Sequence, residues 1–294
     1  MDKNYKLGVL YGLGAYFLWG LLPIYWKQLH HVPAFEILAN RFIWSVVFVL
    51  LLLACTGRLG EFARETRQVF STLKSGCTMV LAAVMIAFNW GIFIWAVEDG
   101  RIVETSLGYY INPLISVLFG MVFLKERLNR LEWTAVALAA LGISVMVVQN
   151  GSLPWVSIAV PGTFAVYGLL KKFISVSPFT SILLETLIIS PVMLCYLGGL
   201  WLEGANAMQS GGALTTVLLI GAGAATATPL LLFTACAKIL PLNMVGFMQY
   251  LSPSMSLLIG VFVYGEAFTL THALTFGCIW LGLGFYICSQ LRKI

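Results

Sequence analysis

Two charged side chains lie inside apolar stretches that are long enough to cross a membrane. Arg41 lies in the stretch from about 35 to 56, and Glu185 lies in the stretch from about 179 to 201. Ionisable residues inside membrane spans are rare and mark solute or proton pathways. Arg41 is therefore a candidate anion contact or gate, and Glu185 is a candidate carboxyl for coupling transport to protons. The alternative is that each side chain snorkels to its own interface, which lies roughly 10 Å away at about 1.5 Å per residue.

Polar residues also recur at three- and four-residue spacing in the stretch from 103 to 124, so in a helix they share one face. A shift of 140 residues places further polar residues at the equivalent positions of a second stretch. The two stripes are Tyr109, Asn112 and Ser116 in the first stretch and Gln249, Ser252 and Ser256 in the second. We interpret them as opposite walls of a central solute cavity. The alternative is helix packing, because such residues also form hydrogen bonds across helix interfaces.

Pro113 and Pro253 occupy equivalent positions in these two stretches. Each proline removes one backbone hydrogen bond in mid-span and favours a kink. The two kinks could act as hinges for rocking of the two halves, or they could bend the bundle statically.

Aromatic residues in mid-span suit a pocket for flat or amphipathic solutes. The candidates for its lining are Trp19, Trp90, Tyr109 and Tyr167, together with the neighbouring amide of Asn89. The alternative for some of them is the aromatic belt at the membrane interface, to which we assign Trp26, Trp155 and Trp201.

The composition predicts the elements that position these residues. The chain of 294 residues is 60% hydrophobic and 10% charged, whereas a soluble domain carries about 25% charged residues. Spanning helices need about 20 apolar residues each, and spanning strands would alternate apolar with polar residues. We therefore predict an all-α polytopic membrane protein, embedded in the lipid bilayer, with ten transmembrane helices. The expected spans are 7–28, 35–56, 74–97, 103–124, 131–149, 153–174, 179–201, 214–237, 242–264 and 270–290.

The basic residues predict the orientation. If both termini are cytoplasmic, the inner segments hold all but three of the 17 Lys and Arg residues. The exceptions are Lys27 and Arg101 on the outer side and Arg41 within a span. This asymmetry follows the positive-inside rule. The net charge of +5 therefore reflects topology, and we expect no nucleic-acid partner.

The same 140-residue shift extends beyond the stripes, since it also pairs Tyr110 with Tyr250 and Glu126 with Glu266. Each repeat then contains five helices, residues 1–150 in the first and 151–294 in the second. An odd number of crossings reverses the orientation of the second repeat. We therefore predict two inverted five-helix repeats, an arrangement that gives transporters two packings, one open to each side of the membrane.

Several stretches resemble the RarD proteins, bacterial members of the EamA branch of the drug/metabolite transporter superfamily. They are AYFLWGLLPIYWK (15–27), EILANRFIWS (36–45), NWGIFIWAV (89–97), ETSLGYYINPLISVLFGMVFLKERL (104–128) and VGFMQYLSPSMSLLIGVFVYGE (245–266). The resemblance covers nearly the whole chain. It implies ten helices in two repeats, a multi-pass location in the bacterial inner membrane, and a role in transport or export.

The sequence contains no Walker GxxxxGK[ST] motif, no HExxH and no GxSxG. The six cysteines form no CxxC pair. Because all these motifs are missing, we expect neither a metal site, nor a cofactor, nor catalytic residues. We predict a secondary transporter, not an enzyme, that exports small metabolites or drug-like amphiphiles by alternating access. The alternative is an integral membrane enzyme or a lipid-handling protein. The oligomeric state and the substrate are left open.

Overall fold

The computed structural model describes residues 3–99, 102–151, 155–265 and 268–292. These residues form thirteen helices and no strand, as expected for an all-α protein. The helices are α1 (Lys3–Lys27), α2 (Ala34–Cys55), α3 (Leu59–Val69), α4 (Leu73–Glu98), α5 (Ile102–Leu124), α6 (Arg130–Asn150), α7 (Val156–Phe173), α8 (Pro178–Leu202), α9 (Ala207–Ser210), α10 (Gly212–Ile239), α11 (Leu242–Met248), α12 (Leu251–Tyr264) and α13 (Leu270–Leu291). Arg101 and Glu266, both used in the sequence predictions, lie outside the described residues.

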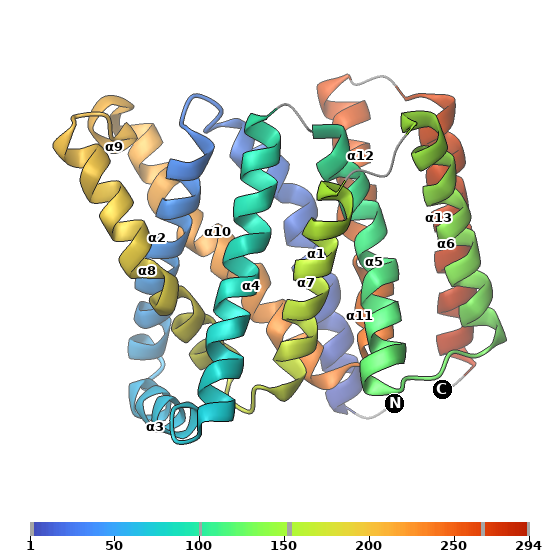
Figure 1. Cartoon of the computed structure of the whole chain (residues 1–294), viewed down its shortest axis with the longest axis horizontal. Coiled ribbons are helices and arrows are strands. Elements are labelled where there is room, and N and C mark those ends of the chain that lie inside the picture. The colour runs from blue at the N-terminus through green and yellow to red at the C-terminus, as the bar shows by residue number, and fades with distance from the viewer. Residues whose placement is uncertain (1–2, 100–101, 152–154, 266–267, 293–294) are drawn as a thin grey trace.

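The long helices run side by side, with both ends of the chain at the lower edge of Figure 1. Within the described residues, nine segments are long and apolar enough to cross a membrane, with α11 and α12 counted as one segment. This confirms a polytopic helical membrane protein. The remaining long helix, α7, has 18 residues and carries Lys171 and Lys172 in its last turn.

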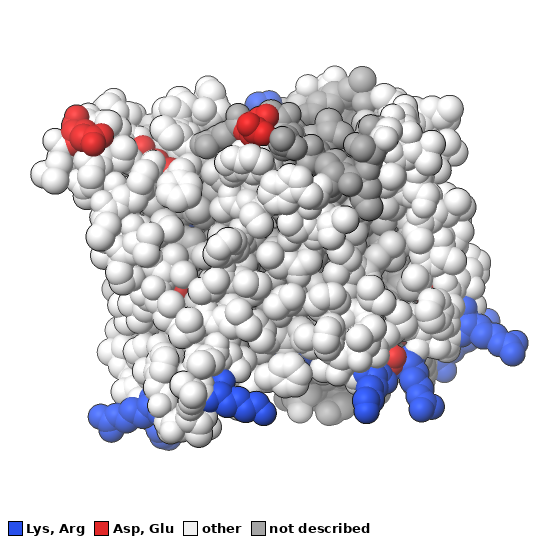
Figure 2. Space-filling model, viewed as in Figure 1, with Lys and Arg blue, Asp and Glu red and all other residues white. Residues whose placement is uncertain are grey.

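Charged side chains gather at the two edges of the face drawn in Figure 2. Most Lys and Arg lie along the lower edge, at the same end as the termini, with one small basic area at the upper edge, where most of the visible acidic side chains lie. A broad band without exposed Lys or Arg separates the edges on this face. Such a band fits the hydrocarbon core of a bilayer.

Matching signals end and begin helices in the two halves of the chain. After α5, Lys125 adopts a positive φ of 55°, and after α12, Gly265 adopts a φ of 68°. Side-chain capping boxes then begin the next helices, at Asn129 for α6 and at Thr269 for α13. Both capping residues satisfy backbone N–H groups that the first helical turn leaves without partners.

Two short helices in the connections were not predicted. At the lower edge of Figure 1, α3 follows α2, and α9 lies at the upper edge between α8 and α10. Arg58, which precedes α3, donates two hydrogen bonds to Glu61, at 2.7 and 2.9 Å. These hydrogen bonds lower the pKa of Glu61 below its ordinary value. The apolar runs that identify spans carry no information about such polar helices.

The expected span 242–264 is interrupted at Gln249 and Tyr250, which separate α11 from α12. Pro253 has no N–H group to donate to the Gln249 carbonyl, so the regular hydrogen bond is missing there. The Ser252 N–H donates to that carbonyl instead, at 3.3 Å. By contrast, α5 continues through Pro113 without a break.

Close helix contacts connect the two halves. Helix α1 packs on α10 and α12, α7 packs on α4 and α5, α2 packs on α8 and α10, and α6 packs on α13. At the crossing of α2 and α10, a Cβ added to Gly223 would lie 2.2 Å from the Trp44 carbonyl carbon. Ser45 donates a hydrogen bond to the Gly223 carbonyl oxygen there, at 3.1 Å. Only glycine permits this approach of two backbones.

Candidate functional site

One residue of each predicted polar stripe meets the other between α5 and the end of α11. The Gln249 side-chain amide donates a hydrogen bond to the Ser116 hydroxyl at 2.9 Å, and both side chains are buried. Close by, a Cβ on Gly246 would lie 2.9 Å from the Pro113 carbonyl oxygen. The two helices therefore approach closely at the position of the stripes.

Two buried oxygens near this contact, the Asn112 amide oxygen and the Tyr250 hydroxyl, have no hydrogen-bond partner in the described part of the chain. An unpaired buried polar atom costs about 1–3 kcal/mol. Such atoms call for an explanation, and contact with a solute is one.

The other members of the second stripe lie on α12. The Ser252 hydroxyl donates to the Tyr16 carbonyl oxygen of α1 at 2.6 Å, which ties α12 to α1. Ser256 is half-buried one turn further along. In the first stripe, Tyr109 is 45% exposed, and its ring packs against Phe93 of α4 with 5.6 Å between the ring centroids.

Arg41 points into the protein from α2. Its Nε donates a hydrogen bond to the Thr226 hydroxyl of α10 at 2.9 Å. Its guanidinium lies 4.3 Å from the ring centroid of Trp90 and 5.0 Å from that of Trp26. Tyr109 is close enough to interact with it electrostatically. The structure thus brings Arg41, Trp90 and Tyr109 together, and it adds Thr226 and Trp26, the latter assigned from the sequence to the interfacial belt.

Asn89 lies next to this group on α4, but its amide faces α7. Its Nδ2 donates to the Val160 carbonyl oxygen at 2.6 Å and to the Thr163 hydroxyl at 3.0 Å. This amide therefore holds α4 against α7.

A second aromatic group lies between α1, α7 and α10. The rings of Trp19, Tyr167 and Phe164 surround Phe233, with centroids 5.2–6.0 Å away from it. Tyr167 is fully buried and stacks on Phe233 at an interplanar angle of 15°. The structure therefore packs Trp19 and Tyr167 around Phe233 as part of the core.

Glu185 is buried in an ion pair with Lys171, at the lower end of α7 and α8. The Tyr167 hydroxyl and the Ser181 hydroxyl also donate to the Glu185 carboxylate, each at 2.9 Å. Glu185 does not snorkel to the interface. A buried carboxylate with three donors is well satisfied.

The lower ends of the two halves are joined by carboxylates that bind backbone N–H groups. Glu126, after α5, accepts from the N–H groups of Leu242 and Asn243 at 2.6 and 2.8 Å. Glu65, on α3, accepts from the Ser177 N–H at 2.9 Å and from its hydroxyl at 2.7 Å. Each carboxylate therefore caps a helix of the other half, α11 or α8.

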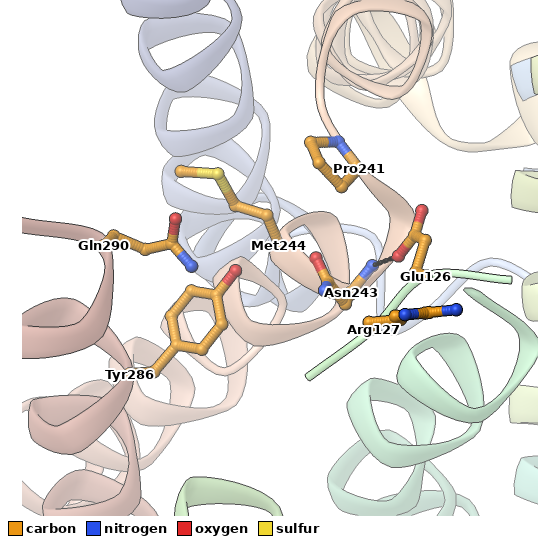
Figure 3. Close-up of a pocket in the computed structure, with 7 residues that line it drawn as sticks. All are labelled: Glu126, Arg127, Pro241, Asn243, Met244, Tyr286 and Gln290. Atoms are coloured by element: carbon orange, nitrogen blue, oxygen red, sulfur yellow. Dashed lines mark hydrogen bonds between the residues drawn. The ribbon is translucent and has the colours of Figure 1, made fainter. Parts of the chain in front are cut away.

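A cavity of about 210 Å³ lies beside the Glu126 cap. Figure 3 shows the Glu126 carboxylate bound to Asn243, while Tyr286 and Gln290 approach from α13 on the other side. The Tyr286 hydroxyl is buried without a hydrogen-bond partner in the described residues. This cavity lies at the lower end of the bundle as drawn in Figure 1, where α5 ends and α11 begins.

The sequence did not reveal Thr226 and Lys171 as partners of the two charged residues. A signal was available for Lys171, because only a short connection separates it from Glu185 and antiparallel neighbours with a short turn bring such positions to similar depth. No sequence signal identifies Thr226, because its contact depends on how α2 crosses α10. No group of three or more His, Cys, Asp or Glu residues that could hold a metal occurs among the described residues.

The apolar helices, the contacts between the two halves and the polar interior define a polytopic helical membrane protein. The model of the EamA-like transporter family matches residues 6–148. The uncharacterized transporter YojE of Bacillus subtilis is 45% identical over 292 residues, which cover 98% of this chain and 95% of that protein. The protein RarD of Salmonella typhimurium is 40% identical over 289 residues, 98% of this chain and 97% of that protein.

A solved crystal structure has the same fold, with a TM-score of 0.71 over 95% of this chain and 96% of that chain. Its sequence identity is 18%, so it supports the fold alone. The chain belongs to the EamA family of transporters, as one of its RarD proteins. The resemblance predicted from the sequence motifs is thereby confirmed.

Proposed function

We propose that this protein is a secondary transporter of the bacterial inner membrane that exports small solutes by alternating access between two inverted five-helix repeats. The repeats are residues 1–150 and 151–294. The observation that carries this proposal is a reciprocal contact between α6 and α13. A Cβ on Gly142 would lie 2.7 Å from the Thr275 carbonyl oxygen, and one on Gly282 would lie 2.9 Å from the Ala135 carbonyl oxygen. The 140-residue shift converts Gly142 into Gly282 and Ala135 into Thr275, so it turns each contact into the other. Helices related by a two-fold axis have this property.

Further features follow the same register. The left-handed residues Lys125 and Gly265 correspond to each other, as do the capping residues Asn129 and Thr269. The contacts of α1 with α12 and α10 correspond to those of α7 with α5 and α4. In this scheme α7 also spans the membrane, as the equivalent of α1, and brings the number of spans to ten.

The contacts at the two ends favour a conformation that is closed at the lower edge. There, Glu126 and Glu65 join the two halves. Toward the upper edge, Tyr109, which neighbours Arg41, is 45% exposed. The basic lower edge faces the cytoplasm by the positive-inside rule, so both termini are cytoplasmic and the solute site opens outward.

The solute contacts the residues near Arg41 and along the two stripes: Trp90, Tyr109, Asn112, Ser116, Gln249, Ser252 and Ser256. We place Trp19, Asn89 and Tyr167 behind these residues, where they pack between helices and hold the site in position. Pro253, at the break between α11 and α12, acts as a hinge, with Pro113 as its counterpart on α5. Aromatic and polar walls together suit small metabolites and drug-like amphiphiles. Any proton coupling through Glu185 would require the Lys171 ion pair to open during the cycle.

Purified protein in liposomes tests the proposal. We expect saturable counterflow of at least one solute from a panel of amino acids, nucleosides, organic acids and amphiphilic drugs. Gly142→Leu, which blocks the contact of α6 with α13, tests whether flux needs the repeat interface in a protein that still folds. Arg64→Gln, on exposed α3, is the control and should leave flux unchanged. Absence of saturable flux, together with turnover of a lipid substrate, would favour the membrane-enzyme alternative.

A further inference from the structure

We infer that the solute carries an anionic group, a carboxylate or another oxyanion on a flat apolar body, which binds the Arg41 guanidinium between Trp26 and Trp90. This inference rests on the proposed transport function, because it identifies the chemistry of the solute at the same site. The observation behind it is a cation inside the protein that has no counter-ion among the described residues.

Arg41 uses little of its hydrogen-bonding capacity. A guanidinium has five N–H donors, and the bond from Nε to the Thr226 hydroxyl is its one hydrogen bond within the described structure. Thr226 is neutral, so it orients the guanidinium without compensating its charge. The four remaining donors have no hydrogen-bond partner within the described structure.

Two buried carboxylates belong to α2 and to its neighbour α8. Glu185, on α8, is paired with Lys171, and Glu36, on the same helix as Arg41, accepts a hydrogen bond from the Ala207 N–H at 2.7 Å through one oxygen and has no partner among the described residues for the other. Neither forms an ion pair with Arg41. Charges removed from water are normally paired, so the counter-ion is expected to come from the solute.

The neighbouring rings define the rest of the ligand. The ring centroids of Trp90 and Trp26 lie 4.3 and 5.0 Å from the guanidinium. Tyr109 of α5 packs against Phe93 of α4. Aromatic faces attract the cation but leave its edge, which carries the N–H donors, available for a planar oxyanion. The same rings can stack on a flat apolar body attached to that oxyanion.

An anionic solute also fits outward movement. A monovalent anion leaving a negative interior is driven by the membrane potential, and about 100 mV shifts its equilibrium gradient roughly 50-fold. No other ion is needed for export of such a solute.

Binding to the full-length protein in nanodiscs tests the inference independently of flux. The probes are two matched pairs of anion and neutral analogue: indole-3-acetate with indole-3-acetamide, and benzoate with benzamide. We expect the anions to raise the melting temperature and the neutral analogues to bind at least 10-fold more weakly. Arg41→Gln should weaken anion binding at least 10-fold and abolish the preference, Arg41→Lys should retain part of it, and Arg64→Gln should leave it unchanged.

Thr226→Val preserves volume and provides a second variant if Arg41→Gln does not fold. Without the hydrogen bond to the Thr226 hydroxyl, the Arg41 guanidinium should be free to rotate. Anion binding should then weaken by several-fold. Equal binding of anion and neutral analogue, failure of both anions to bind, or unchanged binding in a folded Arg41→Gln variant would overturn the inference. Anion binding without counterflow of any solute would instead contradict the proposed transport function and leave the anion site standing.

Discussion

Lys171 and Glu185 face each other in a buried ion pair that joins the end of α7 to the first turns of α8. Lys171 is fully buried and Glu185 is 2% exposed, and the Ser181 hydroxyl lies 2.8 Å from the Lys171 nitrogen and 2.9 Å from the carboxylate. Pairs of this kind are strongly coupled. Removing one partner leaves a charge buried and uncompensated, whereas replacing both by neutral residues removes the problem.

We therefore expect Lys171→Met and Glu185→Gln each to lower the free energy of unfolding by about 3–5 kcal/mol, and the double variant to recover most of this loss. Thermal unfolding of the three variants in detergent measures the effect. Additive losses in the double variant would show that the two side chains are not coupled.

The same pair allows a test of proton coupling. If Glu185 carries the coupling proton, Glu185→Gln abolishes pH-driven uptake and spares solute exchange. The three donors to the carboxylate favour a structural role instead. We expect the double variant Lys171→Met/Glu185→Gln, once folded, to keep the pH dependence of flux. Loss of pH-driven uptake with intact exchange would instead establish Glu185 as the coupling group.

Asn112 and Ser252 occupy equivalent positions in the repeat but differ in their contacts. The Asn112 amide oxygen is buried without a partner in the described residues, whereas Ser252 binds the α1 backbone. Asn112→Leu should therefore reduce flux at least 10-fold with a melting temperature within a few degrees of the parent. Ser252→Leu should lower both, because it breaks the tie between α12 and α1. Flux and thermal stability measured on the same preparations decide this, and a parallel loss of both in Asn112→Leu would assign it to packing.

The sequence predicted the long helices well, because apolar runs reflect the bilayer thickness directly. The expected span 179–201 corresponds to α8 (Pro178–Leu202), and 35–56 corresponds to α2 (Ala34–Cys55). The break at Gln249 was less accessible to prediction. Pro113 and Pro253 occupy equivalent positions, and only the tertiary contacts decide which of them interrupts a helix.

Individual side-chain partners were harder to predict. The matched stripes suggested that the helices carrying Ser116 and Gln249 face each other, but the hydrogen bond between these two side chains was not predicted. The partners of Arg41 depend on the crossing of α2 and α10, and the partners of Asn89 depend on how α4 meets α7. A single sequence does not specify how either pair of helices crosses. It therefore could not predict which face of each helix points toward its neighbour.

Gly223 is the position where α10 is least able to tolerate a side chain. A Cβ there would lie 2.2 Å from the Trp44 carbonyl carbon and 2.6 Å from the Ser45 nitrogen, both backbone atoms that cannot move independently. Gly223→Ala should destabilise the protein by about 1–3 kcal/mol, as over-packing does. Gly91→Ala in α4 is the matched control, because nothing lies within 4 Å of its Cβ position. Equal melting temperatures of the two variants would contradict the close crossing of α2 and α10.

Glu126 provides the last prediction, because its carboxylate joins the end of α5 to the start of α11. Hydrogen bonds to a charged group contribute about 1.5–3 kcal/mol each, so Glu126→Gln should weaken the closure of the lower edge. Gly120→Ala should act similarly, since its Cβ would lie 2.5 Å from the Glu126 carboxylate. Glu61→Gln, which affects only the surface pair with Arg58, is the control.

The buried thiol of Cys236 reports this opening. Its sulfur would lie 2.8 Å from a Cβ on Gly12 of α1, so it is covered by the contact between α1 and α10. In a chain whose other five cysteines are replaced by serine, Glu126→Gln and Gly120→Ala should raise the rate of Cys236 alkylation at least 10-fold. If Glu61→Gln accelerates the reaction equally, the increase reflects general loosening and the Glu126 cap does not control the lower edge.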